Sequence, residues 1–145
     1  MTSVEPSREP GVEPIIAVQR STCWIGTYAL RIRLVAPRTI AIGRLRQGQL
    51  IPFAAGNYLY VGSALGSPGS LALPRRLLRH ASRSALQSPH PLHAALLEHF
   101  AAAGLDATAL PLKRPKRLRW NIDYLLDDSG IMLAQVFYIR SPLRL

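Results

Sequence analysis

The stretch from position 58 to position 80 most constrains how this chain can fold, because it combines three different local patterns. It begins as a short apolar strand, which is followed by a segment rich in glycine, serine and proline. A basic amphipathic pattern comes next, in which Leu73, Leu77 and Leu78 make an apolar stripe at helical spacing. Pro74 fits such a helix only near its first turn, since proline has no N–H to donate. The stretch therefore predicts a strand, a turn and a helix, in that order.

The predicted helix carries an arginine and a histidine on one face. Arg76 and His80 are four residues apart, so their side chains stand one turn apart. Facing Tyr60 at the end of the strand, they have the chemistry to hold a phosphodiester. The alternative is structural, with Tyr60 in the core and the arginines on a solvated helix face, as is common for charged helices. These residues alone leave both interpretations open.

The segments on either side predict an α+β fold, with a small, largely antiparallel sheet and packed helices. Residues 30–34 alternate apolar and basic side chains, the pattern of a half-buried strand, and Pro37 ends it. Residues 39–45 and 49–53 are two further strand candidates around a polar turn. Residues 58–61 follow another turn signal, so the first sixty residues resemble an antiparallel meander.

The second half of the chain predicts a further helix and a final strand. The helix covers residues 91–103 and is ended by Gly104. Its acid, Glu98, is expected to be exposed. The strand covers residues 131–139, after a turn rich in aspartate, serine and glycine.

Length and composition suggest one domain preceded by a tail. A chain of 145 residues fits a single domain with a sizeable core. Glutamate, proline, serine and glycine dominate its beginning, so we expect residues 1–20 to form a flexible tail and residues 21–145 to form the domain.

The net charge of +10 is unusually high for a chain of this size. Such a field favours a polyanionic partner, with nucleic acid ahead of an anionic membrane surface. No apolar run is long enough to span a bilayer, and the beginning of the chain lacks the apolar core of a secretory signal. The single cysteine, Cys23, excludes an intramolecular disulfide and is consistent with a reducing compartment, so we expect a cytoplasmic location.

The densest charge cluster precedes a tryptophan. It consists of Lys113, Arg114, Lys116, Arg117 and Arg119. We interpret this run as one that follows a phosphate backbone, with a solvated loop as the alternative. Trp120 is expected to pack against the core, although an indole beside basic residues can also stack on a base.

Three short motifs, in their order along the chain, resemble those of the GIY-YIG nuclease superfamily. Gly26-Thr27-Tyr28 corresponds to the first motif and Tyr60-Val61-Gly62 to the second. The helix then matches a Leu-x-x-Arg-x-x-x-His pattern through Leu73, Arg76 and His80. The long gap between the tyrosine motifs has room for an inserted hairpin, and a Trp-x-Ile-Asp-Tyr-Leu block follows at residues 120–125. Both features are similar to the Uri-type, formerly uncharacterised branch, and the resemblance covers roughly residues 26–139.

The resemblance implies hydrolysis of DNA phosphodiesters with a divalent metal, Mg²⁺ or Mn²⁺. From the net charge and the basic run at 113–119 we expect the partner to be duplex or branched DNA. Tyr28 and Tyr60 would stand beside the scissile phosphate, where one of them positions or deprotonates the attacking water. A tyrosine pKa near 10 would have to be lowered by nearby cations for the second role. Arg76 would stabilise charge developing on the phosphate, and His80 would be a second base or a proton relay. Gly62 would allow close backbone approach, or would simply be a turn residue.

The metal ligand departs from the family pattern. The resemblance places a glutamate on a helix after the last strand, yet residues 140–145 contain no acid, so the expected glutamate-bearing helix is missing. Asp123 and Glu98 are then the remaining candidate ligands. Asp123 has a structural ion pair to an arginine as its alternative, and Glu98 has solvent exposure. Asn121 also replaces an expected histidine.

Three functional hypotheses follow from this departure. The first is a metal-dependent DNA endonuclease-like domain. The second is a nucleic-acid-binding module that keeps the fold and the phosphate cleft without hydrolysis. The third is a basic structural component of a nucleoprotein assembly, which would bind RNA and DNA alike without need of the tyrosines. The sequence leaves the substrate preference and the oligomeric state open.

Overall fold

The structure is a computed structural model, and it describes residues 11–67, 69–85 and 87–142. Its elements follow the chain as β1 (Ile15–Gln19), β2 (Gly26–Leu34), β3 (Arg38–Ala41), a short 3-10 turn (Leu45–Gly48), β4 (Leu50–Phe53), β5 (Gly56–Ala64), α1 (Ala72–Ala81), α2 (Leu92–Ala102), α3 (Asn121–Asp127) and β6 (Ile131–Arg140). The predicted α+β class is therefore confirmed.

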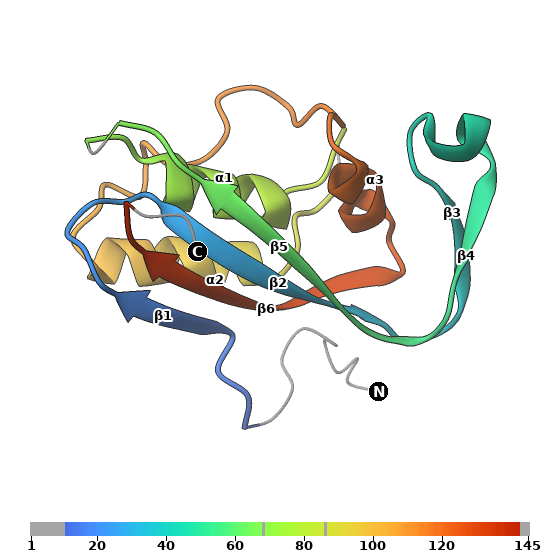
Figure 1. The fold of residues 1–145 in the computed structure, drawn as a ribbon, viewed down its shortest axis with the longest axis horizontal. Helices are drawn as coiled ribbons and strands as arrows, with labels where there is room; N and C mark the ends of the chain where they lie inside the picture. Colours follow the sequence, from blue (N-terminus) through green and yellow to red (C-terminus); the bar gives the residue numbers. More distant parts are fainter. Residues whose placement is uncertain (1–10, 68, 86, 143–145) are drawn as a thin grey trace.

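Four of the strands form the main sheet, in the order β1-β6-β2-β5 (Figure 1). β2 runs antiparallel to β5 on one side and to β6 on the other. The last strand lies second in the sheet because its long apolar sequence suits a position between two neighbours. The largely antiparallel sheet expected from the sequence is thus present, with β1 beside β6 as its parallel pair.

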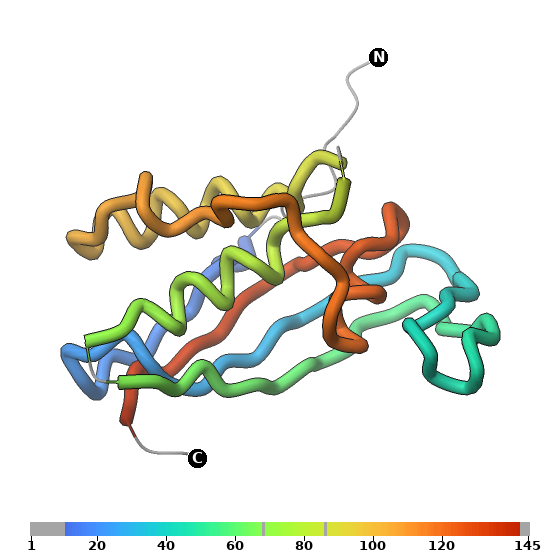
Figure 2. The backbone as a smooth tube through the Cα atoms, turned by 90° about the horizontal axis from the view of Figure 1, so that it is seen from above, coloured from blue at the N-terminus to red at the C-terminus, as the bar shows by residue number. Residues whose placement is uncertain are grey.

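The sheet is covered by α1 and α2 on one face, which makes a two-layer molecule (Figure 2). Leu73, Leu77 and Leu78 of α1 are each 0% exposed, so the apolar stripe seen in the sequence is the face that packs on the sheet. On the opposite face, Leu59 and Val61 of β5 remain 71% and 66% exposed. The core therefore lies between the helices and one side of the sheet.

The beginning of the chain differs from its expectation. Residues 1–20 were expected to form a flexible tail, but Ile15–Gln19 is strand β1, paired in parallel with residues Val136 to Arg140 of β6. The apolar patch inside the proline-rich segment supplies this strand, and a partner distant in sequence stabilises it. Residues 1–10 of the expected tail lie outside the described residues.

A separate hairpin is inserted between the two tyrosine-bearing strands. β3 and β4 pair antiparallel and stand apart from the main sheet, next to α3 (Figure 1). The first of these strands is shorter than the sequence suggests, because residues 45–48 form the 3-10 turn. Within this turn Arg46 and Gln47 have φ angles of 48° and 57°, the left-handed region that residues with a Cβ rarely adopt.

The two longer helices agree with the sequence within a residue or two, whereas α3 was not predicted. Its seven residues are too few to give a periodic signal. Among the described residues, no helix is long and apolar enough to cross a membrane.

Candidate functional site

Tyr28 and Tyr60 lie on the same face of the sheet. In the β2–β5 register Tyr28 pairs with Gly62 and Leu30 pairs with Tyr60. Residues two apart on a strand share a face, so both phenols point toward the helical layer. Their ring centroids are 6.4 Å apart. The predicted convergence of the two tyrosines is confirmed.

The two motif glycines leave room for their neighbours. Gly62 lies within β5, so it is not a turn residue, and a Cβ atom built on it would be 2.5 Å from the Tyr28 hydroxyl oxygen. A Cβ on Gly26 would overlap the backbone carbonyl of Ile139 in β6. Close approach is therefore the reason for glycine at both positions.

His80 joins the tyrosines from α1. Its side chain is fully buried, and its Nε2 atom is 2.7 Å from the Tyr28 hydroxyl oxygen. The imidazole centroid lies 5.3 Å from the Tyr28 ring and 5.9 Å from the Tyr60 ring. Among the described residues, His80 Nδ1 has no hydrogen-bond partner although it is buried. One ring nitrogen is thus held by Tyr28, and the other is buried with its hydrogen-bonding capacity unused.

Burial keeps this Tyr–His pair uncharged at neutral pH. It raises the pKa of Tyr28 to about 12, with the nearby Tyr60 adding to the rise and Arg76 opposing it. It lowers the pKa of His80 to about 3, helped by the charge of Lys116. The nearby cations therefore do not lower the pKa of Tyr28, as a role as base would require. At neutral pH Tyr28 is a hydroxyl donor and not a base.

Arg76 reaches the same cluster from one turn earlier on α1. Its guanidinium carbon lies 4.5 Å from the centroid of the Trp120 ring, and its Nη1 donates a long hydrogen bond of 3.4 Å to the Ser63 carbonyl. Arg79 contacts the same indole at 4.8 Å. Trp120 is half-buried against the core, as expected, and it also orients two arginines through cation–π contact.

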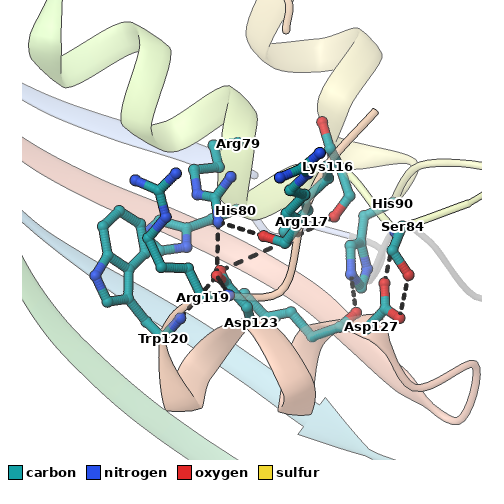
Figure 3. A network of polar contacts seen from close by, with 12 residues as sticks. Arg79, His80, Ser84, His90, Lys116, Arg117, Arg119, Trp120, Asp123 and Asp127 are labelled. Atoms are coloured by element: carbon teal, nitrogen blue, oxygen red, sulfur yellow. Dashed lines mark hydrogen bonds and ion pairs between the residues drawn. The ribbon is translucent and has the colours of Figure 1, made fainter. Parts of the chain in front are cut away.

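Asp123 lies at the centre of a buried network next to His80 (Figure 3). Its carboxylate is 0% exposed and accepts hydrogen bonds from the Arg79 side chain at 2.7 Å and from the backbone N–H groups of Arg119 and Trp120. The Lys116 ammonium lies 3.8 Å away. Burial alone would raise the pKa of this carboxyl, but the two backbone bonds and the cations lower it below its usual range. These contacts favour the structural alternative for Asp123.

A second carboxylate ties α3 to the end of α1. Asp127 accepts hydrogen bonds of 2.6 Å from both the backbone N–H and the hydroxyl of Ser84. Buried His90, labelled in Figure 3, donates from Nε2 to the Leu126 carbonyl. Its Nδ1 accepts from the Leu133 N–H. Together with the Asp123 network, these bonds fix α3 against the helix that carries Arg76 and His80.

The described residues do not fit a divalent metal site as they stand. None of them form a group of three or more histidine, cysteine or acidic side chains placed to hold a metal ion. Mg²⁺ and Mn²⁺ prefer carboxylate oxygens, and Asp123, the carboxylate beside the tyrosines, is surrounded by the cations of Arg79 and Lys116. Glu98 is exposed on α2, as expected.

The basic run forms a groove beside this network. The groove measures about 360 Å³ and is lined by Arg79 together with the segment from Leu112 to Arg119. Lys113, Arg114, Arg117 and Arg119 are exposed, which fits both the expected contact with a phosphate backbone and the solvated-loop alternative. Lys116 differs from them, because its buried Nζ donates to the Ser82 carbonyl at 2.9 Å, and burial lowers its pKa to about 8.

Sequence reasoning missed Arg79 and Asp127, which hold the site together. Arg79 lies between Arg76 and His80 in the sequence of α1. No local sequence pattern marked it as a site residue, because its partner Asp123 is 44 positions away. The Trp-x-Ile-Asp block was the available signal, since an acid three residues after a helix start accepts backbone bonds from that start.

Comparison with known families gives one match over most of the chain. The model of a family described as a domain of unknown function, DUF123, matches residues 27–145, which include both tyrosines, Arg76 and His80. Neither the curated proteins nor the solved structures give a match.

Proposed function

The chain belongs to the DUF123 family, a GIY-YIG-like family, and from this premise we propose that it binds DNA and seats a backbone phosphate at the cluster of Tyr28, Tyr60, Arg76 and His80. The observation that carries the proposal is this convergence of two phenols, an imidazole and an oriented guanidinium beside a basic groove. As a finer proposal we assign the chain to the Uri-type branch, which the inserted hairpin and the Trp120 block support.

Arg76 is the phosphate ligand in this proposal. Its cation–π contact with Trp120 restrains the guanidinium, which offers a fork of N–H donors matched to two phosphate oxygens. Its bond to the Ser63 carbonyl is long, at 3.4 Å, so little is lost when a phosphate replaces that partner. Tyr60, at the cluster's half-buried edge, donates to the same group or positions a water molecule beside it.

Tyr28 and His80 form the buried part of the cluster. Their hydrogen bond keeps the Tyr28 hydroxyl in one position, and both groups are neutral before a ligand binds. A bound phosphate brings negative charge near the imidazole and favours its protonation. His80 therefore gains proton affinity when the substrate arrives, which suits a relay better than a permanent base.

The exposed cations of the 113–119 segment supply the remaining affinity. They line one groove with Arg79, which itself contacts Trp120 beside Arg76, so a polynucleotide backbone can run from the groove to the cluster. Each phosphate neutralised by a basic side chain releases condensed counterions, so affinity falls with salt.

Salt dependence of DNA binding tests the proposal. Replacing Lys113, Arg114 and Arg117 with glutamine should weaken duplex binding and flatten the slope of log affinity against log salt by about 0.9 for each phosphate that the variant no longer neutralises. The matched control changes three exposed arginines elsewhere, Arg20, Arg44 and Arg75, and so removes the same charge. Equal slopes for the two triple variants would contradict the proposed groove.

Hydrolysis is the second candidate function, favoured by the two tyrosines and the histidine around the arginine. A nicking assay in Mg²⁺ or Mn²⁺ compares the wild-type chain with Tyr60→Phe and Arg76→Ala, and with Arg75→Ala as the control from the exposed side of α1. Cleavage that Arg76→Ala abolishes and Arg75→Ala keeps would assign an endonuclease. Binding without cleavage would instead assign a DNA-binding module that holds a phosphodiester without hydrolysing it.

The assay also tests Asp123 as a metal ligand. Asp123→Asn removes a buried charge that Arg79 and Lys116 share, so a structural role predicts a lower unfolding midpoint together with lost activity. A metal-ligand role predicts lost activity in a variant that remains as stable as the wild type and regains cleavage at a higher Mn²⁺ concentration.

A further inference from the structure

A groove between the inserted hairpin and α3 shares Tyr60 with the proposed phosphate site and none of that site's other three residues. It measures about 390 Å³, within the roughly 300–1,000 Å³ range of small-molecule sites. Its walls are apolar side chains of the hairpin and of α3, chiefly Ile51, Phe53 and Leu125. Two polar side chains, Arg46 and Asn121, complete the lining.

The groove adjoins the proposed phosphate site through Tyr60 and through the chain neighbour of Trp120. Tyr60 belongs to both, because its ring lines the groove and also lies 5.9 Å from the His80 ring. Asn121 directly follows Trp120, on which Arg76 stacks. A nucleotide whose phosphate is held by Arg76 therefore has its sugar and base within reach of the groove.

The chemistry of the lining suits a nucleobase. Phe53 and the aliphatic walls offer the apolar surface on which a flat base stacks, and stacking of this kind tolerates any base. Among the described residues, the Asn121 side chain has no hydrogen-bond partner, so its amide can donate to and accept from a base edge. Arg46, exposed beside the groove, adds a cation suited to the adjoining phosphate.

We propose that this groove holds one unpaired nucleobase next to the phosphate at Arg76, so that the protein prefers DNA in which a base is bulged or otherwise free. The inference rests on the proposed DNA-binding function and adds a substrate class to it. A base inside a paired duplex must first leave its stack, whereas a bulged base is already unpaired. The inserted hairpin is then the element that recognises the substrate's structure.

The test compares three duplexes by fluorescence anisotropy: one with a single bulged thymidine, one with a bulged abasic nucleotide, and one fully paired. We expect the bulged thymidine to bind about fivefold or more tightly than the abasic bulge, as stacking of one base predicts. Leu45→Ser and Asn121→Ala should each reduce this ratio below about twofold, since both residues line the groove. The matched control is Leu50→Ser, which changes an exposed leucine of the same hairpin outside the groove and should leave the ratio unchanged.

Photocrosslinking places the base directly. A bulged 5-iodouracil should link to Phe53 or Tyr60, and mass spectrometry of the digested complex identifies the residue. Links confined to other parts of the chain would overturn the inference.

The outcomes separate this inference from the proposed function. Equal affinity for thymidine and abasic bulges would overturn the base site and leave DNA binding intact, as would a preference that survives both groove variants. A wild-type chain that binds none of the three duplexes would overturn both. A dimer in sedimentation that Leu45→Ser dissociates would make the groove an interface between two copies and would overturn the base site.

Discussion

The close contact between Gly62 and Tyr28 leaves no room for a side chain at position 62. A Cβ at position 62 would lie 2.5 Å from the phenol oxygen, and the buried ring cannot retreat without breaking its bond to His80. We expect Gly62→Ala to lower the free energy of unfolding by about 1–3 kcal/mol, the usual range for overpacking. Urea unfolding measures the change.

Gly69→Ala is the matched control for this prediction. No atom lies within 4 Å of the Cβ position at Gly69, and no positive φ constrains it. Its unfolding free energy should stay within about 0.5 kcal/mol of the wild type. Two variants of equal stability would show that the phenol can move aside.

Two buried histidines predict a loss of stability in mild acid. Burial lowers the pKa of His80 to about 3 and that of His90 to about 4, against 6.5 in the unfolded chain. Below pH 6.5 the unfolded chain binds protons that the folded chain does not, so stability is complete above that pH and falls as the pH drops toward 4. Each histidine contributes a slope of about 1.4 kcal/mol per pH unit.

Unfolding in urea at pH 7, 6 and 5 tests this slope. His90→Gln should reduce the slope by about 1.4 kcal/mol per pH unit, because one titrating imidazole is gone. An unfolding free energy that is constant between pH 7 and pH 5 would contradict the buried neutral state of both rings.

At the residue scale the sequence predicted the cluster but not the network that supports it. The prediction of Tyr28, Tyr60, Arg76 and His80 as one cluster came from the resemblance of three short motifs to a known superfamily, and the spacing within a strand or a helix alone left a structural role open. The Arg79–Asp123 pair joins α1 to α3 across 44 positions, and no local pattern specifies such a pair. The contacts of a residue depend on the completed fold, which the motifs do not contain.

The turn of the inserted hairpin carries a strain that a single substitution should relieve. Gln47 is exposed and has a φ of 57°, where a Cβ crowds the backbone and glycine does not. We expect Gln47→Gly to raise the free energy of unfolding by about 0.5–1 kcal/mol. Thermal and urea unfolding measure the change.

Gln49, two residues further along, serves as the comparison. It is equally exposed, but its φ of −67° and ψ of 150° are ordinary extended values. Gln49→Gly should therefore lower stability by about 0.5–1 kcal/mol, because glycine adds freedom to the unfolded chain. The same sign for both variants would rule out relief of left-handed strain as the cause.

Elements with a clear period were predicted, and those defined by distant partners were not. The leucine stripe of α1 and the alternation in β2 gave correct elements from sequence alone. β1 lies in a segment whose composition suggests a tail, and it becomes a strand because β6 offers a parallel edge. The bounds of β3 were wrong because the chain enters its 3-10 turn early.

The two-layer architecture of the whole molecule predicts that similar substitutions have different effects on the two faces of the sheet. Leu30 on β2 is 0% exposed beneath the helices, whereas Leu59 on β5 is 71% exposed on the uncovered face. Leu30→Ala should lower the free energy of unfolding by about 2–5 kcal/mol, because it leaves a cavity in the core. Leu59→Ala should lower it by less than about 1 kcal/mol.

Comparable losses for these two variants would mean that the second face is covered in solution. The measurement is urea unfolding at several protein concentrations, since a face covered by a second copy gives a midpoint that rises with concentration.

The place where the hairpin leaves the sheet allows the two parts of the molecule to vary independently. Leu34 is the last residue of β2 and Gly56 is the first of β5, and the two are paired with each other. The inserted segment between them therefore begins and ends at the same place on the sheet. A longer, shorter or differently shaped hairpin leaves the register of Tyr28 and Tyr60 unchanged, and loop length affects stability only slowly. The inserted hairpin can thus be exchanged for another while the residues of the proposed phosphate site keep their positions.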